Sequence, residues 1–192
     1  MPQISLTTPL SESMVENLRI GQQVLLNGVI YTAEEKSHRR MAEALSQGCE
    51  LPFPIANQVL FYATFSPAKP GSLCGSAGPS DSGHFDPYTP QLIARGLKGM
   101  IGKGARSPEV IKVMKRLKAV YFAAVGGASA LIARSIKSCR VIAYPELGEE
   151  AVCELLVEDL PLIVVNDVLG GNLYRESASI YAGKARGVLR RR

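Results

Sequence analysis

Residues 24–31 read Val24-Leu25-Leu26-Asn27-Gly28-Val29-Ile30-Tyr31, and they give the first strong indication of the fold. Two runs of residues with high β propensity flank the pair Asn27-Gly28. Asn-Gly favours the positive φ angles of a tight turn between antiparallel strands. The stretch therefore predicts a β-hairpin that turns at Asn27 and Gly28.

Downstream of residue 31 the sequence alternates between helical and strand patterns. Helices are predicted at 34–45, at 92–95 and at 108–118, the last with Ser107 as its cap and Pro108 in its first turn. Strands are predicted at 58–64, 99–102, 119–125, 141–144, 152–157 and 162–165. Short strands around a few helices predict a single compact domain of mixed α/β (α+β) class.

Length and charge define a domain with a basic tail. A chain of 192 residues with 46% hydrophobic and 20% charged residues is typical of one globular domain, predicted here at 1–183. The net charge is +5, and residues 184–192 carry five basic side chains and no acid. The body is therefore formally neutral, which argues against nucleic-acid binding, and the tail is predicted to be flexible.

The cysteines and the apolar runs indicate a reduced, cytoplasmic protein. Cys49, Cys74, Cys139 and Cys153 form no C-x-x-C pair, so the spacing predicts neither a zinc site nor a redox motif. Cys139 and Cys153 lie in apolar stretches and are expected to be core thiols. The first ten residues lack a basic secretory leader, and every apolar run is shorter than the roughly 20 residues that span a bilayer.

A segment rich in glycine and proline, residues 66–90, predicts a long loop. Its centre contains Gly78-Pro79-Ser80-Asp81 and then His84. Small residues leave backbone N–H groups free to face a ligand, while Ser80, Asp81 and His84 add groups that can exchange protons. Taken alone, such a segment is more often a surface turn than a binding loop.

Three other motifs are ambiguous when taken singly. Gly102-Lys103-Gly104 places an ammonium group at a strand end but lacks the spacing of a P-loop. Gly126-Gly127-Ala128 fits either an anion site at a helix start or close strand–helix packing. Residues 34–40 read as a solvated helix face with its acids first.

The order of these motifs resembles the β region of class I fumarases and L-tartrate dehydratases, over roughly residues 10–175. The resemblance implies a swivelling β/β/α domain that closes over a [4Fe–4S] cluster held by three cysteines of a separate α region. Nothing in this chain is similar to that region. The cluster is therefore expected on a partner α subunit, with none bound here, in a hetero-oligomer; a homodimer is the alternative for the isolated chain.

The resemblance also implies roles for individual residues. Lys103, between Gly102 and Gly104, matches a substrate-binding lysine, and His38 matches a histidine of the same site. Ser80, after Gly78 and Pro79, stands where the family has a threonine that moves the proton at carbon. From the residues alone, either Asp81 or His84 is a candidate to activate the Ser80 hydroxyl.

Two positions depart from the family pattern, because Glu34 and His84 stand where arginines are expected. Neither replaces a guanidinium that grips a carboxylate with two hydrogen bonds. The resemblance implies a hydro-lyase subunit, inactive alone, that hydrates or dehydrates a hydroxy acid, and the loss of two cations weakens the case for a C4 dicarboxylate. Fumarate/malate is the default substrate and tartrate or a related acid the next. A non-catalytic or regulatory relative, or an unrelated binder of phosphate ligands, stays open, and the 66–90 loop is expected to be mobile without a partner.

Overall fold

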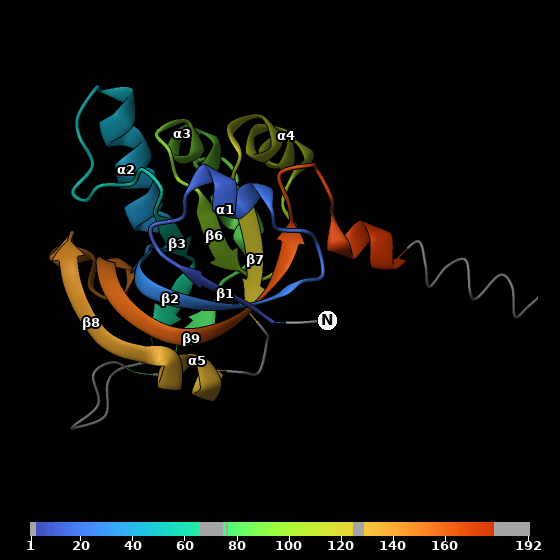
Figure 1. Ribbon diagram of the computed structural model, residues 1–192. Coiled ribbons are helices and arrows are strands. Elements are labelled where there is room, and N and C mark those ends of the chain that lie inside the picture. Colours follow the sequence, from blue (N-terminus) through green and yellow to red (C-terminus); the bar gives the residue numbers. More distant parts are fainter. Residues whose placement is uncertain (1–2, 66–74, 76, 125–128, 179–192) are drawn as a thin grey trace, which may run out of the picture.

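The computed structural model describes residues 3–65, 75, 77–124 and 129–178, which form one compact mixed α/β domain (Figure 1). The predicted fold class is therefore confirmed. The strands are β1 (Ile4–Thr7), β2 (Gln23–Thr32), β3 (Val59–Phe61), β4 (Ala63–Phe65), β5 (Ala77–Pro79), β6 (Gly99–Gly102), β7 (Val120–Ala124), β8 (Ile136–Ala143) and β9 (Val152–Asn166). The helices are α1 (Glu12–Glu16), α2 (Glu35–Ser46), α3 (Thr89–Ala94), α4 (Pro108–Leu117), α5 (Ser129–Ser135) and the 3₁₀ helices η1 (Ser82–Phe85) and η2 (Pro145–Glu150).

Some predicted features lie outside the described residues. They are Cys74, most of the first part of the 66–90 segment, the Gly126-Gly127-Ala128 junction and the basic tail 184–192. Within the described residues, no helix is long and apolar enough to cross a membrane.

Seven strands form a sheet in the order β1-β2-β3-β6-β7-β9-β8. The pairs from β1 to β7 are parallel, whereas β9 runs antiparallel to β7 and β8. Strand β9 also pairs with β2, from Gln23 opposite Ile163 to Thr32 opposite Cys153. This extra pairing closes β2, β3, β6, β7 and β9 into a ring of hydrogen-bonded neighbours.

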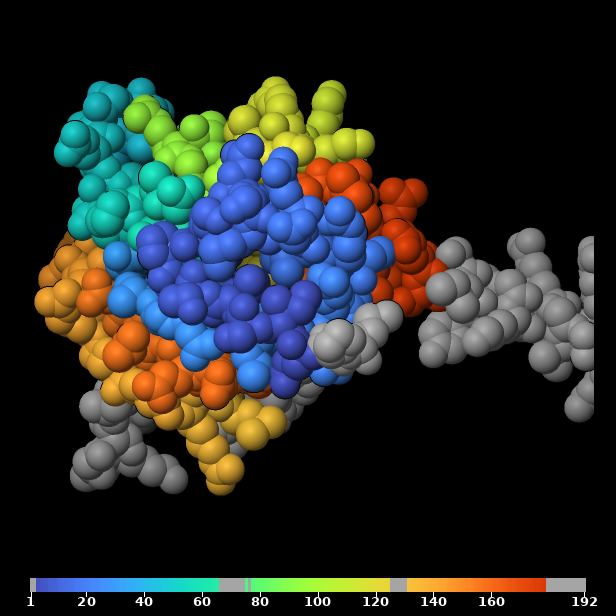
Figure 2. Space-filling model, viewed as in Figure 1, coloured from blue at the N-terminus to red at the C-terminus, as the bar shows by residue number. Residues whose placement is uncertain are grey.

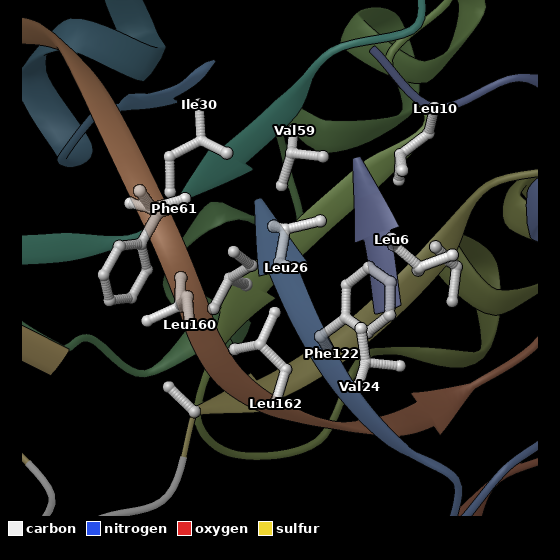
Figure 3. Packing of buried hydrophobic residues seen from close by; sticks show 14 of the residues in the cluster. Leu6, Leu10, Val24, Leu26, Ile30, Val59, Phe61, Phe122, Leu160 and Leu162 are labelled. Atoms are coloured by element: carbon white, nitrogen blue, oxygen red, sulfur yellow. The ribbon is translucent and has the colours of Figure 1, made fainter. Parts of the chain in front are cut away.

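The inside of this ring is the main hydrophobic core. Alternate residues of each strand point inward, as strand geometry requires. Figure 3 shows this packing for Val24, Leu26, Ile30, Val59, Phe61, Phe122, Leu160 and Leu162. Each large apolar side chain that is fully buried contributes about 1.5–3 kcal/mol through removal from water.

The N-terminal residues cover one face of the ring. Leu6 of β1, Leu10 in the following turn, and Val15 and Leu18 around α1 all belong to the interior core. In the space-filling view the N-terminal segment, in blue, lies across the centre of the visible face and covers these buried side chains (Figure 2). The N-terminal segment is thus an integral part of the domain.

A second core lies outside the ring, beneath helices α2, α3 and α4, which gather on one side of the molecule (Figure 1). Alternation within the strands decides which residues face it: Leu60, Met100 and Tyr121 point outward from β3, β6 and β7. They pack against helix residues that include Met41 and Met114. The predicted caps of α4 are present, because Ser107 Oγ accepts a hydrogen bond from Val110 N and Pro108 is the first helical residue.

The predicted hairpin at 24–31 is wrong, since these residues lie within the single strand β2. Gly28 does adopt a positive φ, +99°, but at a bulge opposite β9 and not in a turn. The reason lies in Thr8, whose Oγ1 would be 2.5 Å from a Cβ at position 28 and which donates a hydrogen bond to Val29 O. Glycine is required at this position by the close approach of a distant segment.

Other element boundaries also differ from the predictions. The strands predicted at 152–157 and 162–165 are one strand, β9, while the strand predicted at 58–64 is divided into β3 and β4 around Tyr62. The second part of the predicted 66–90 loop contains β5, η1 and the first residues of α3. Strand β5 pairs with β4, so tertiary pairing orders a segment whose composition predicts only turns.

Candidate functional site

The site is built where three parallel strands end. Because β2, β3 and β6 are parallel neighbours, their C-terminal ends meet at one edge of the sheet. Glu34 follows β2, Tyr62 follows β3 and Lys103 follows β6. Ligands of α/β proteins commonly bind at such an edge.

A groove of about 500 Å³ lies there. Six of the nine site residues predicted from the sequence line it, and Gly102 and Gly104 flank one of these six, Lys103. The full lining is Glu34, Glu35, Thr64, Gly78, Pro79, Ser80, Asp81, His84, Phe85 and Lys103. A second hollow of about 530 Å³ lies beside the end of α2, among Leu45, Phe53 and Arg95. It contains none of the predicted site residues, so the groove at the strand ends is the candidate site.

Ser80 and Lys103 are held together by backbone hydrogen bonds. Lys103 N donates to Ser80 O at 3.0 Å, and Ser82 N donates to Lys103 O at 2.8 Å. Ser80 N donates in turn to Tyr62 O at 2.8 Å. The segment carrying Ser80 is therefore fixed between the ends of β3 and β6, and its position does not depend on its side chain.

The glycines on either side of Lys103 allow this close approach. A Cβ on Gly102 would collide with Ser82 Oγ and would lie 3.1 Å from Tyr62 Cδ2. Gly104 has a φ of +78°, and a Cβ there would lie 2.8 Å from Asp81 Oδ1. The Gly-Lys-Gly motif thus accommodates the segment that carries Ser80, which is a reason beyond simple access to a ligand.

The Ser80 hydroxyl has a carboxylate partner. Ser80 Oγ donates a hydrogen bond to Glu34 Oε1 at 2.6 Å. Thr64 Oγ1 lies 3.5 Å from the same Ser80 oxygen. Burial raises the pKa of the Glu34 carboxyl, while the Ser80 hydrogen bond opposes that rise. Sequence reasoning treated Glu34 only as the loss of a cation and missed this pairing.

The two other predicted proton-exchanging residues have different surroundings. Asp81 Oδ1 accepts a hydrogen bond from Gly83 N at 3.0 Å, so this carboxylate caps η1. His84 is exposed and lines the groove. Neither donates to or accepts from Ser80 in the part of the chain that the structure describes, and their catalytic roles stay predictions.

Lys103 is the only lysine among the described residues that line the groove. Its side chain is exposed and forms no ion pair with another described residue. The same lining carries three acids, Glu34, Glu35 and Asp81. The described lining therefore offers one ammonium group as a partner for a carboxylate, and it is poor in cations for a second.

His38, predicted to bind substrate, is fully buried beneath the groove and is absent from its lining. Its ring packs against Phe85 at 4.7 Å and Tyr62 at 5.1 Å between centroids. Its Nδ1 pairs with the carbonyl of Glu34 at 3.0 Å, and Nε2 has no partner among the described residues. The structure thus gives His38 a supporting position, and a direct substrate contact stays a prediction.

Burial lowers the pKa of the His38 imidazole to about 4. The unfolded chain takes up this proton below pH 6.5, whereas the folded chain does so only near pH 4. Between these values the free energy of unfolding should fall by about 3 kcal/mol as the pH decreases. His38→Gln should remove this dependence in denaturant titrations at pH 6.5, 5.5 and 4.5. His84→Gln, which replaces an exposed imidazole, is the control and should retain it; equal slopes in all three proteins would contradict the assignment.

Arg106 supports the floor of the site from below. Its side chain is fully buried and forms a 2.8 Å ion pair with Asp86 and a 2.6 Å hydrogen bond to Thr89 Oγ1. The guanidinium also lies over the rings of Tyr62 and Tyr121, 5.2 and 5.4 Å from their centroids. Because Tyr62 O receives the Ser80 N–H, this buried charge stabilises the residue that orients the Ser80 segment.

The described residues do not supply a ligand set for a metal cluster. No group of three or more His, Cys, Asp or Glu side chains in that part of the chain could hold a metal ion. Cys49 is exposed near the end of α2, and Cys139 and Cys153 lie half-buried on β8 and β9 against the interior core. These three cysteines therefore do not fit an iron–sulfur cluster.

Comparison with known proteins gives class I fumarate hydratases among the relatives of this chain. The aerobic class I fumarate hydratase of Escherichia coli K12 is 32% identical over 177 residues, which are 90% of this chain and 32% of that enzyme. The corresponding enzyme of Salmonella typhimurium is 31% identical over 186 residues, 95% of this chain and 32% of that enzyme. The chain thus spans about a third of the length of these fumarate hydratases.

A relative of similar size is also found. A Methanocaldococcus jannaschii protein, provisionally named as the β subunit of an L(+)-tartrate dehydratase, is 34% identical over 173 residues. The match covers 87% of this chain and 89% of that protein. The sequence profile described as "Fumarase C-terminus" matches residues 1–177. The chain therefore belongs to the fumarase C-terminus family.

Proposed function

We propose that this chain is the β component of a hydro-lyase that adds water to, or removes it from, a small hydroxy acid. The observation that carries the proposal is the groove at the strand ends, where Ser80 and Lys103 are held side by side by backbone hydrogen bonds. A hydroxyl that exchanges a proton and a cation that binds a carboxylate are the two groups that such a reaction needs next to each other.

The proposal includes a partner that carries an iron–sulfur cluster. An iron with a free coordination position acts as a Lewis acid on a hydroxyl or carboxylate. The Methanocaldococcus relative, named as a subunit and similar in length to this chain, supports a separate α component. The swivelling closure over the partner, the inactivity of the chain alone and the hetero-oligomer belong to this proposal. Cytoplasmic placement stays a prediction from the sequence.

Within this proposal the residues of the groove have distinct tasks. The Lys103 ammonium binds a substrate carboxylate, and Ser80 Oγ exchanges the proton at the carbon next to the departing hydroxyl. Phe85, buried beneath the groove, excludes water from that side. With one lysine among three acids, we infer a substrate whose second polar group is a hydroxyl, or whose second carboxylate is bound by the partner. Fumarate/malate and tartrate are the first candidates to test.

The test is reconstitution with a cluster-bearing α component under anaerobic conditions. A panel containing fumarate, malate, tartrate and other hydroxy acids is assayed by the absorbance of the carbon–carbon double bond. We expect turnover of one member only when both components are present. If the complex is stable and its cluster intact but no member of the panel is turned over, the result would favour a non-catalytic relative. Glu34 and His84, which replace the expected arginines, support that alternative.

Removing the Lys103 ammonium should weaken substrate binding. A hydrogen bond to a charged group contributes roughly 1.5–3 kcal/mol, so Lys103→Ala should raise KM about tenfold to a hundredfold. Lys112→Ala, which removes an exposed lysine of α4, is the matched control and should leave KM unchanged. An unaltered KM for Lys103→Ala would contradict the role of Lys103.

A further inference from the structure

Ser80 needs a proton acceptor if it is to work as a base. A serine hydroxyl has a pKa far above neutrality, so a proton from carbon can pass to its oxygen only if its own proton leaves at the same time. The structure offers one described carboxylate in hydrogen-bond contact with that oxygen, Glu34, at 2.6 Å. We propose that Glu34 is the proton acceptor of Ser80 and that the two residues form a relay, an inference that rests on the proposed function.

Backbone hydrogen bonds fix the positions of both Ser80 and Glu34, so their contact is set by the fold. Ser80 is fixed through Tyr62 O and Lys103 N. Glu34 precedes the first turn of α2, where its N–H donates to Ser37 Oγ at 2.9 Å and its carbonyl accepts from His38 N at 2.9 Å. The two backbones thus aim the side chains at each other across the groove.

Among the described residues, the other acids near Ser80 either have different partners or make no hydrogen bond to its hydroxyl. Asp81 Oδ1 accepts the Gly83 N–H, and Glu150 on η2 pairs with Lys36 at 2.6 Å. Glu35 is exposed in the first turn of α2 and lines the groove, but it makes no hydrogen bond to Ser80 within the described part of the chain. The hydrogen-bond geometry therefore selects Glu34.

The step balances as a proton relay. In the dehydration direction the C–H bond breaks, its proton passes to Ser80 Oγ, and the Ser80 proton passes to the Glu34 carboxylate. The electron pair of the C–H bond forms the carbon–carbon double bond. The C–O bond on the neighbouring carbon breaks, and hydroxide leaves with the electron pair of that C–O bond. The proton on Glu34 then combines with the hydroxide to give water. Hydration is the reverse sequence.

The electrostatics of the pair make the Glu34 carboxylate a stronger base than an exposed glutamate. Burial raises the pKa of Glu34, and the nearby charges of Glu150 and Glu35 act in the same direction. The Ser80 hydrogen bond and His84 act in the opposite direction. Glu34 must be ionised to accept the proton, so activity should fall as the pH decreases through its raised pKa.

The kinetic experiment compares Glu34→Gln with Glu43→Gln, which removes an exposed carboxylate from the same helix. In the reconstituted enzyme Glu34→Gln should lower kcat about a hundredfold or more. KM should change by less than about threefold, because the contact between Lys103 and the substrate remains. The acidic limb of the pH–rate profile should disappear in Glu34→Gln and persist in Glu43→Gln. Formate should restore part of the activity of Glu34→Ala, which a purely structural role would not allow. Wild-type kcat in Glu34→Gln, or an unchanged acidic limb, would overturn the relay.

A second measurement does not depend on turnover or on the partner. Carboxyl ¹³C resonances of the isolated chain are titrated by NMR, and Glu34 is assigned from its absence in Glu34→Gln. The pKa of Glu34 should lie above that of an exposed glutamate, and Ser80→Ala should raise it further because a hydrogen bond to the carboxylate is lost. An identical titration in wild type and Ser80→Ala would overturn the pairing. An inactive wild-type complex, by contrast, would overturn the proposed hydro-lyase function alone.

Discussion

Replacing Ser80 by alanine should lower kcat of the reconstituted enzyme by about 10²- to 10⁴-fold, the range expected when a positioned proton-exchanging group is lost. The backbone of residue 80 is held by Tyr62 O and Lys103 N, so the variant should keep the same fold and the same KM to within about threefold. Steady-state kinetics and thermal denaturation check both parts.

Ser80→Thr is the matched control, because it keeps the hydroxyl and reproduces the residue that the family resemblance implies at this position. It should retain most of the activity. Equal activity of Ser80→Ala and wild type would show that the proton at carbon is moved by another group. A large loss in Ser80→Thr as well would point to steric exclusion of a methyl group near Thr64.

The largest effect on stability should come from the buried pair of Arg106 and Asp86. Asp86→Asn keeps an acceptor for Ser107 N, which Asp86 Oδ2 binds at 2.6 Å, but leaves the buried guanidinium without a counter-charge. Breaking a buried pair from one side costs about 3–5 kcal/mol. Chemical denaturation should show a loss of this size in the free energy of unfolding.

The double variant Asp86→Asn/Arg106→Met separates charge from packing. It removes both charges and keeps an unbranched side chain between Tyr62 and Tyr121. Because replacing a whole buried pair is often close to neutral, the double variant should recover a large part of the lost stability. A double variant that is less stable than Asp86→Asn would contradict this account and assign the effect to the aromatic contacts of Arg106.

Much of the fold could be predicted from local pattern. The strand at 119–125 is continuously apolar, and the helix at 108–118 is marked by Ser107 and Pro108, so both were placed within a residue or two of β7 and α4. The errors arise where a distant segment decides. Gly28 serves a bulge because Thr8 lies against it, and charged residues at 158 and 159 hide the continuity of β9, where Asp159 N donates to the Asn27 side chain.

The candidate site was also predictable only in part, because some of its contacts join segments that are distant in the sequence. Ser80 and Lys103 were found from the order of short motifs, and the structure holds them together. The family pattern presents Glu34 only as the loss of an arginine, and its hydrogen bond to Ser80 depends on segments far apart in the sequence. Only a single strand β2, parallel to β3, brings Glu34 to the edge where Ser80 lies.

The closed ring also limits aggregation of this chain through the pairing of exposed strand edges. Unpaired strand edges are templates for aggregation. Ring closure leaves no unpaired edge along the paired parts of the described strands β2, β3, β6, β7 and β9. In the described seven-stranded sheet β1 and β8 are the outermost members. β8 is the longer of the two, and its Lys137 and Arg140 pair with Glu158 and Glu154 of β9. Charged side chains disfavour pairing with a strand of another molecule, so Lys137 and Arg140 protect the longer of the two outer edges of the described sheet.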